Sequence, residues 1–166
     1  MALGTFVPGE YVFSHGGNAL GLIQSDGPRL KFTPHSRPVS DTAIYGDTKI
    51  DGIYRGQDVQ VLVTFKEWTA NIRTAIWPYG AAGFDGTLGQ IGRLDSALAS
   101  VILLTAASNS PAAAANSPAT LQANLGIIAP ENEIDILMGP DERNIPVLFD
   151  LLPYDASGTI RHFAIT

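Results

Sequence analysis

Carboxylates are the side chains of this 166-residue sequence whose spacing most suggests chemistry. Glu131, Glu133 and Asp135 alternate, so in a strand they would line one face at the two-residue period. Paired acids of this kind hydrolyse glycosidic bonds when an aromatic cleft holds the sugar. A solvated strand face accounts for the same pattern without any reaction.

Other residue types that catalyse reactions or bind cofactors are absent or unsuitably spaced. The sequence has no cysteine, which excludes disulfides, zinc–thiolate sites and thiol nucleophiles. His15, His35 and His162 show no metal-ligand spacing, and no Gly-x-Ser-x-Gly signal marks a serine nucleophile. The glycines of residues 86–92 are three apart, which is not the spacing of a dinucleotide-binding loop. We therefore expect no enzyme, no cofactor and no metal.

The charge of the chain argues against a second group of functions. Ten lysines and arginines against sixteen acids give a net charge of −6 at pH 7, without a basic cluster. Affinity for phosphate is built from cation contacts, so specific DNA binding and attachment to an anionic membrane are not expected. Residues 126–166 carry seven acids against Arg143 and Arg161, a net −5, so the negative charge is concentrated in the last quarter.

Length and composition favour one domain spanning residues 1–166. A content of 45% hydrophobic and 16% charged residues excludes intrinsic disorder. Neither a run of eighteen apolar residues nor a secretion leader at residues 1–17 is visible, so we expect no membrane span and synthesis in a reducing cytoplasm.

Seventeen glycines and eleven prolines divide the chain into segments of strand length. This predicts a mainly β fold, a β-sandwich or barrel with one short flanking helix and long loops. Strands are expected at residues 10–15, 19–24, 30–33, 49–54, 58–68, 100–106, 121–128, 133–138, 145–152 and 159–166. Turns at 16–18 and 55–57 would make hairpins of their flanking strands, with Gly56 in a special backbone conformation.

The remaining segments predict one helix and several loops. Apolar spacing predicts a helix over residues 70–77, opened by Thr69 and stopped by Pro78. Residues 80–92 are expected to form a glycine-rich linker, and residues 107–119 an exposed loop of small residues. The first part of residues 94–104 has the apolar spacing of a helix and the last part that of a strand. Residues 34–48 are expected to form a long loop, which is either a functional loop that becomes ordered against a partner or a flexible surface loop without a function.

The order of these parts resembles the major tail tube proteins of long-tailed bacteriophages. The likeness lies in the pattern of most of the chain, and two segments carry it, residues 49–68 and residues 143–154. In the first of them an alternating strand runs directly into a short helix. The resemblance implies a β-sandwich or barrel with a flanking helix, six copies in a ring, and rings stacked as a hollow tube in the virion tail. No residue is catalytic in such a protein.

The resemblance also implies partners and contact segments. The partners are further copies of the chain, a tape measure protein and tail terminator or tip proteins, while DNA passes through the lumen without specific binding. Residues 1–9 and 161–166 are candidate arms that cross to neighbours. The loop after the early strands reaches an adjacent ring in that family. The inter-ring residues implied here are Pro34, His35, Arg37, Val39, Asp41, Tyr45 and Asp47.

Physical arguments fit this resemblance. An acidic channel suits moving DNA, because each lumen cation would add phosphate binding that must be broken at every step. The candidate lumen acids are Glu131, Glu133, Asp135, Asp141, Glu142 and Asp150. Plain solubility explains the same charge asymmetry. A chain this apolar should also expose surface that burial between subunits would remove.

Other functions are compatible with the same sequence. A capsid decoration or head–tail joining protein would share its apolar, β-rich composition. A carbohydrate-binding β-sandwich would use Tyr54, Trp68, Trp77 and Tyr79 to stack on sugars. An unrecognised hydrolase would need three distant side chains to converge.

Overall fold

A computed structural model describes residues 10–21, 23, 27–40, 49–80, 83–86, 88–108, 120–130, 132–136 and 144–166. Within these ranges the protein is mainly β, with two short helices, and the expected fold class is confirmed. The strands are β1 (Tyr11–His15), β2 (Asn18–Ala19), β3 (Arg29–Ser40), β4 (Lys49–Phe65), β5 (Ser100–Ala106), β6 (Leu121–Ile128), β7 (Ile145–Leu151), β8 (Tyr154–Asp155), β9 (Ile160–Arg161) and β10 (Ala164–Ile165). The helices are α1 (Ala70–Ile76) and α2 (Asp95–Leu98).

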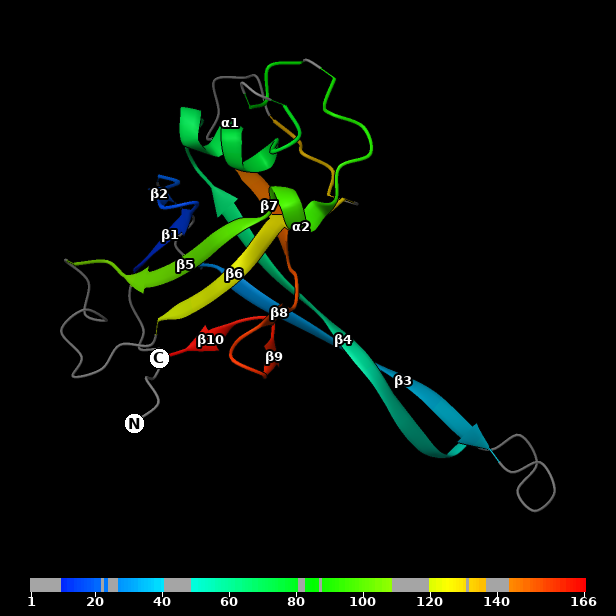
Figure 1. Ribbon diagram of the computed structural model, residues 1–166. Coiled ribbons are helices and arrows are strands. Elements are labelled where there is room, and N and C mark those ends of the chain that lie inside the picture. Colours follow the sequence, from blue (N-terminus) through cyan, green and yellow to red (C-terminus); the bar gives the residue numbers. More distant parts are fainter. Residues whose placement is uncertain are drawn as a thin grey trace.

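One antiparallel sheet makes up most of the molecule, in the order β2-β1-β5-β6-β7-β4-β3, with β10 added to β6 (Figure 1). This sheet curls over on itself. The ring of Phe13 on β1 lies 5.4 Å from that of Phe149 on β7 and 6.1 Å from that of Phe65 on β4. Three strands separate β1 from β4 in the sheet, so these contacts require two facing layers around one core.

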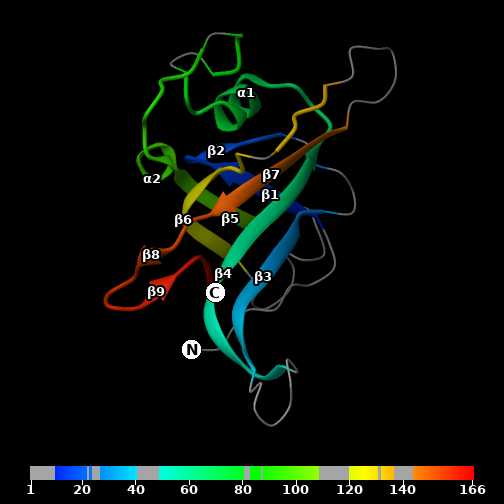
Figure 2. The same cartoon turned by 90° about the vertical axis from the view of Figure 1, so that its right-hand side faces the viewer.

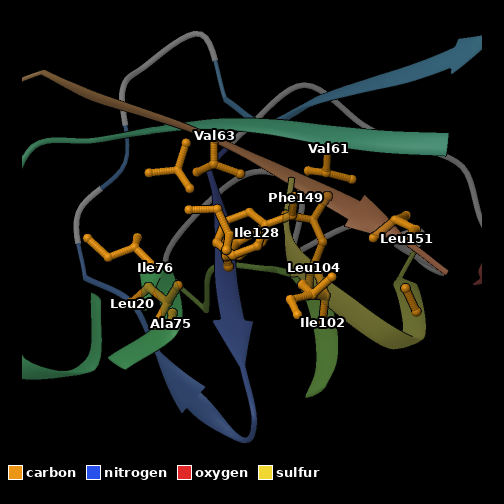
Figure 3. Packing of buried hydrophobic residues seen from close by; sticks show 14 of the residues in the cluster. Leu20, Val61, Val63, Ala75, Ile76, Ile102, Leu104, Ile128, Phe149 and Leu151 are labelled. Atoms are coloured by element: carbon orange, nitrogen blue, oxygen red, sulfur yellow. The ribbon is translucent and has the colours of Figure 1, made fainter. Parts of the chain in front are cut away.

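The core is built from every second residue of the central strands. Val59, Val61, Val63 and Phe65 of β4 are buried, as are the alternating residues of β7. Figure 3 shows Val61 and Val63 facing Ile102 and Leu104 of β5 across Phe149. Fully burying each such side chain contributes about 1.5–3 kcal/mol, which fixes the inner face of each strand.

Helix α1 closes one end of this core, beside α2 in Figure 2. The Oγ1 atom of Thr69 accepts a hydrogen bond from the backbone N–H of Ile72 at 3.3 Å, which caps the helix start. Ile72, Ala75 and Ile76 are fully buried, so α1 is stabilised by packing. The predicted helix is therefore confirmed, and residues 94–104 hold α2 followed by β5, as their two patterns indicated.

The first hairpin is also confirmed, although β2 is shorter than expected. Gly16 and Gly17 both have positive φ, 58° and 82°, as a tight two-residue hairpin turn requires. The strands predicted at residues 100–106, 121–128 and 145–152 correspond to β5, β6 and β7.

The expectation of a long loop at residues 34–48 is wrong for residues 34–40, which belong to β3 and pair with β4. Both prolines of this segment, Pro34 and Pro38, lie on the outermost strand of the sheet, where a missing N–H interrupts no inner ladder. Residues 41–48 lie outside the described residues.

The expected hairpin at residues 55–57 is also wrong, because residues 49–65 form the single strand β4. Gly56 pairs with His35 and Tyr54 with Ser36, so Arg55 is an extra residue in β4. Gly56 has φ of 129°, and Arg55 and Gly56 together form a β-bulge where a turn was expected.

Two further strand predictions need correction. A strand was predicted at residues 133–138, but residues 133–136 pair with no strand. Residues 137 and 138 lie outside the described residues. The terminal strand predicted at 159–166 is divided into β9 and β10. Most of the expected exposed loop, residues 109–119, is outside the described part of the chain.

Candidate assembly surface

The most distinctive feature of the molecule is a hairpin that projects from the body. The strand β4 pairs with β7 only from Gln60 to Phe65, whereas it pairs with β3 from Lys49 to Leu62. The arm, defined as β3 together with residues 49–59 of β4, therefore extends past the rest of the sheet (Figures 1 and 2). An isolated two-stranded hairpin is marginally stable in water.

One face of the arm continues the apolar inner face of the sheet. Paired residues of antiparallel strands share a face, and Leu30 pairs with Val61 while Phe32 pairs with Val59. Both valines are buried, but the Phe32 residue is 53% exposed because no described element covers this part of β3. Pro34 follows on the same face, so an apolar stripe runs out from the core onto the arm.

The opposite face of the arm is polar and basic. Arg29, Lys31 and Thr33 alternate with the apolar stripe. The Nε2 atom of His35 lies 2.7 Å from Oδ2 of Asp58, with side chains 51% and 70% exposed. A contact so exposed contributes at most about 1 kcal/mol, and it links β3 to β4 beside the bulge.

Four of the seven predicted inter-ring residues lie within the described part of the chain, and three lie outside it. Pro34, His35, Arg37 and Val39 lie on β3 in the arm. Asp41, Tyr45 and Asp47 lie outside the described residues.

The candidate lumen acids are not gathered into one cluster within the described residues. Glu133 and Asp135 are exposed in the segment after β6, outside any strand. Asp150 is half-buried on β7, where its Oδ1 accepts a hydrogen bond from Nε2 of Gln60 at 2.7 Å. The remaining three, Glu131, Asp141 and Glu142, lie outside the described residues.

A hollow of about 600 Å³ lies where the arm leaves the body. Its walls include Tyr54 and Asp58 from the arm, Asp150 from β7, and Ile160 and His162 from the C-terminal hairpin. The ring Nδ1–H of His162 donates to the backbone carbonyl of Leu151 at 2.6 Å. Two carboxylates held by hydrogen bonds, one from Gln60 and one from His35, make this a polar recess.

A second exposed apolar surface lies at the other end of the molecule, next to α1. The apolar loop, residues 83–86 and 88–94, exposes 85% of Leu88, 89% of Ile91 and 74% of Leu94. The backbone N–H of Phe84 donates to the carbonyl of Arg73 at 3.0 Å. This surface was not predicted, because the glycines of the segment indicated a linker, although its apolar residues three apart were a visible signal.

Aromatic side chains form the base of the apolar loop. The ring of Phe84 lies 6.0 Å from those of Trp68 and Trp77, edge to face, and Trp77 lies 5.4 Å from Tyr79. A hollow of about 300 Å³ opens beside them, lined by Trp77, Phe84, Gly86 and Leu88. Three of the four residues predicted to stack on sugars meet here, while Tyr54 lies on the arm.

Two described groups have displaced pKa values. Burial lowers the pKa of His15 below 6.5, opposed by the hydrogen bond from its ring Nε2–H to the carbonyl of Gly126, which raises it. Burial raises the pKa of Tyr79, and the charges of Asp95 and Asp150 raise it further.

No three His, Asp or Glu side chains come together to hold a metal ion in the described part of the chain. In the same residues, no helix combines the length and the apolar character that crossing a membrane would need. Neither the models of known protein families nor the curated proteins include a match to this chain.

Proposed function

We propose that the protein is a structural subunit that assembles through its arm into rings stacked as a hollow tube, the tail tube of a long-tailed bacteriophage. The observation that carries the proposal is the arm itself, with an uncovered apolar stripe and β3 at the edge of the sheet. Such a hairpin gains stability when another chain covers it. A free edge and apolar face of this kind are typical of a subunit that joins its copies.

The proposed setting follows from the resemblance described above. Six copies would form each ring, and the tube would lie in the virion tail after synthesis in the host cytoplasm. The other partners would be a tape measure protein and tail terminator or tip proteins. This role involves no reaction and no cofactor.

The distribution of charge supports a conduit for DNA. Residues 29–58 hold five of the ten bases and four of the sixteen acids, so the rest of the chain carries twelve acids against five bases. Repeating this net negative charge around a ring would produce a strong field that repels phosphate from the wall. DNA would then pass without being retained.

A capsid decoration or head–tail joining protein is the second candidate, because an arm that reaches a neighbour suits it equally. Negative-stain electron microscopy of the purified protein separates the two. Tubes of uniform bore support the tail tube, whereas binding only to preformed capsids supports the decoration protein.

Shortening the arm tests the assembly proposal. Deleting residues 39–47 removes the last two residues of β3 and most of the segment that joins β3 to β4 in the sequence, and leaves the core strands intact. We expect this variant to remain folded by circular dichroism but to give no stacked tubes in electron micrographs, because in the proposed assembly this segment makes the contact between rings.

A deletion of equal length provides the control. Removing residues 110–118, between β5 and β6, should leave tubes of normal length. Normal tubes from the arm deletion, or a wild-type chain that remains monomeric at high concentration in light scattering, would contradict the proposal.

A further inference from the structure

Within the described residues, the arm and the apolar loop are unlike apolar surfaces that lie at opposite ends of the molecule. The arm points away from the body on one side, while the apolar loop caps the other end beside α1 (Figures 1 and 2). A two-fold symmetric contact would pair one patch with itself, whereas two different patches joined head to tail build rings or open filaments. The arrangement therefore favours growth by contact of one surface with the other.

The shapes of the two surfaces are complementary. The arm presents a narrow ridge on which Phe32 is the largest exposed side chain of the apolar stripe. The apolar loop presents a hollow of about 300 Å³ between aromatic rings. A large aromatic side chain that enters a desolvated pocket is the usual anchor of a protein interface.

Backbone contacts anchor the loop to the body of the molecule. Besides the hydrogen bond from Phe84 to Arg73, the backbone N–H of Gln90 donates to the carbonyl of Tyr79 at 2.9 Å. A Cβ at Gly89 would approach Cβ of Tyr79 to 2.5 Å, so the loop lies directly on the body there. A surface that is already ordered loses little conformational entropy when a partner binds.

The charges of the two surfaces are also opposite. The arm carries five lysines and arginines against Asp51 and Asp58, a net positive charge. The loop and α2 carry Asp85 and Asp95 against Arg93. The bases of β3 lie on the face opposite Phe32, so the opposite net charges favour the approach of arm to loop over arm to arm, while the apolar contact itself sets the register.

From these observations we infer that the arm of one copy seats on the apolar loop of a second copy, with Phe32 in the hollow lined by Trp77, Phe84 and Leu88. The inference rests on the proposed assembly function and specifies the surface that receives the arm. Each copy donates one arm and accepts one arm, so the contact propagates.

Mixing two variants, each defective at one end, tests this contact. Phe32→Asp removes the apolar anchor of the arm and leaves the apolar loop unchanged. Leu88→Asp places a charge in the hollow of the loop and leaves the arm unchanged. Both side chains are exposed, so each variant should unfold at the wild-type temperature. Each alone should assemble only at a concentration at least about 30-fold higher than wild type, because a central anchor is lost. Their equimolar mixture should give a 1:1 dimer that grows no further, measured by sedimentation.

Matched controls make the test specific. Ile160→Asp changes an exposed apolar residue of β9, outside both the arm and the apolar loop, and should assemble as wild type. Because the chain has no cysteine, mixed Phe32→Cys and Leu88→Cys variants should form a disulfide-linked dimer on oxidation. Neither cysteine variant alone should do so, and nor should a mixture of Ile160→Cys with Leu88→Cys.

The outcomes separate the inference from the proposed function. Tubes formed normally by Leu88→Asp, no dimer in the mixture of defective variants, or no cross-link between the mixed cysteine variants would overturn the seating of the arm on the loop, while wild-type tubes would still support the assembly function. A wild-type chain that never assembles would overturn both.

Discussion

At the scale of single residues, His15 shows how sheet closure sets the chemistry of a side chain. Its ring lies 5.7 Å from that of Phe149, and its Nε2–H donates to the carbonyl of Gly126 at 3.2 Å. The ring is therefore enclosed by β6 and β7, although His15 itself ends β1. Desolvation disfavours the imidazolium and favours the neutral ring, which retains the donor that Gly126 needs.

The lowered pKa of His15 predicts a pH dependence of stability. Above pH 6.5 the ring is neutral in the folded and unfolded chains, so its full contribution is present. Below pH 6.5 the unfolded chain binds a proton more readily than the folded chain, so the free energy of unfolding falls, by at most about 1.4 kcal/mol per pH unit. His15→Gln should remove this component. Urea unfolding between pH 7 and 5 should show a smaller loss of stability for the variant than for wild type; equal losses would contradict the assignment.

Gly126 is a second residue whose type is dictated by its surroundings. A Cβ at this buried position would fall on the side chain of Ile102, which is itself fully buried on β5. The register of β5 against β6 shifts between Ser100 and Ile102, next to this contact. Glycine thus allows the two strands to pass closely at the irregularity.

At the scale of elements, the arm should be locally less stable than the strands it grows from. Residues 61–65 of β4 all pair with β7, and on the other side residues 61 and 62 pair with β3 and Phe65 bridges to Ile23, whereas among the described strands only β3 lies beside residues 49–58. Local opening therefore costs less free energy in the arm.

Hydrogen exchange of dilute, unassembled protein measures this difference within a single strand. Amides of residues 33–40 and 49–58 should exchange at least about 100-fold faster than those of residues 61–65, because they open without disrupting the core. Assembly should slow exchange in the arm and leave the core amides unchanged. Equal protection of the two parts of β4 in dilute protein would show that the arm is not an independent element.

The arm also shows what the sequence could and could not predict. Alternation of Val59, Val61 and Val63 identified the inner half of β4 because burial selects every second residue. The outer half has no core to face, so its residues carry no such alternation. A glycine with positive φ fits a bulge as well as a turn, and only the partner strand decides between them.

The candidate assembly surface was predictable only in part. Four of the residues predicted to contact an adjacent ring lie on the arm, where their role stays a prediction, and the prolines concealed that these residues form a strand. The apolar loop was missed because glycines on either side of Leu88 indicate irregular backbone, and sequence alone does not distinguish a linker from an anchored loop. The anchoring hydrogen bonds are made to distant residues of α1 and the segment after it.

At the scale of the whole molecule, closure of the sheet is the property on which both surfaces depend. The two layers meet through a few large side chains, with Phe13 of β1 touching Phe65 and Phe149 across the core. Leu20, after β2, is buried in the same cluster. Without closure the arm and the apolar loop would have no fixed relation, and the proposed head-to-tail growth would lose its geometry.

Phe13→Ala should therefore destabilise the entire domain and not only β1. Phe13 is fully buried, and truncating such a ring removes contacts with two other strands and leaves a cavity, which costs about 3–5 kcal/mol. Val12→Ala, its neighbour on the exposed face of β1, should cost less than about 1 kcal/mol. Urea unfolding at one protein concentration, followed by tryptophan fluorescence near α1 and by circular dichroism of the sheet, should report the same midpoint shift for Phe13→Ala. A shift no larger than that of Val12→Ala, or separate transitions for the two probes, would mean that the layers fold independently and that β1 does not close the core.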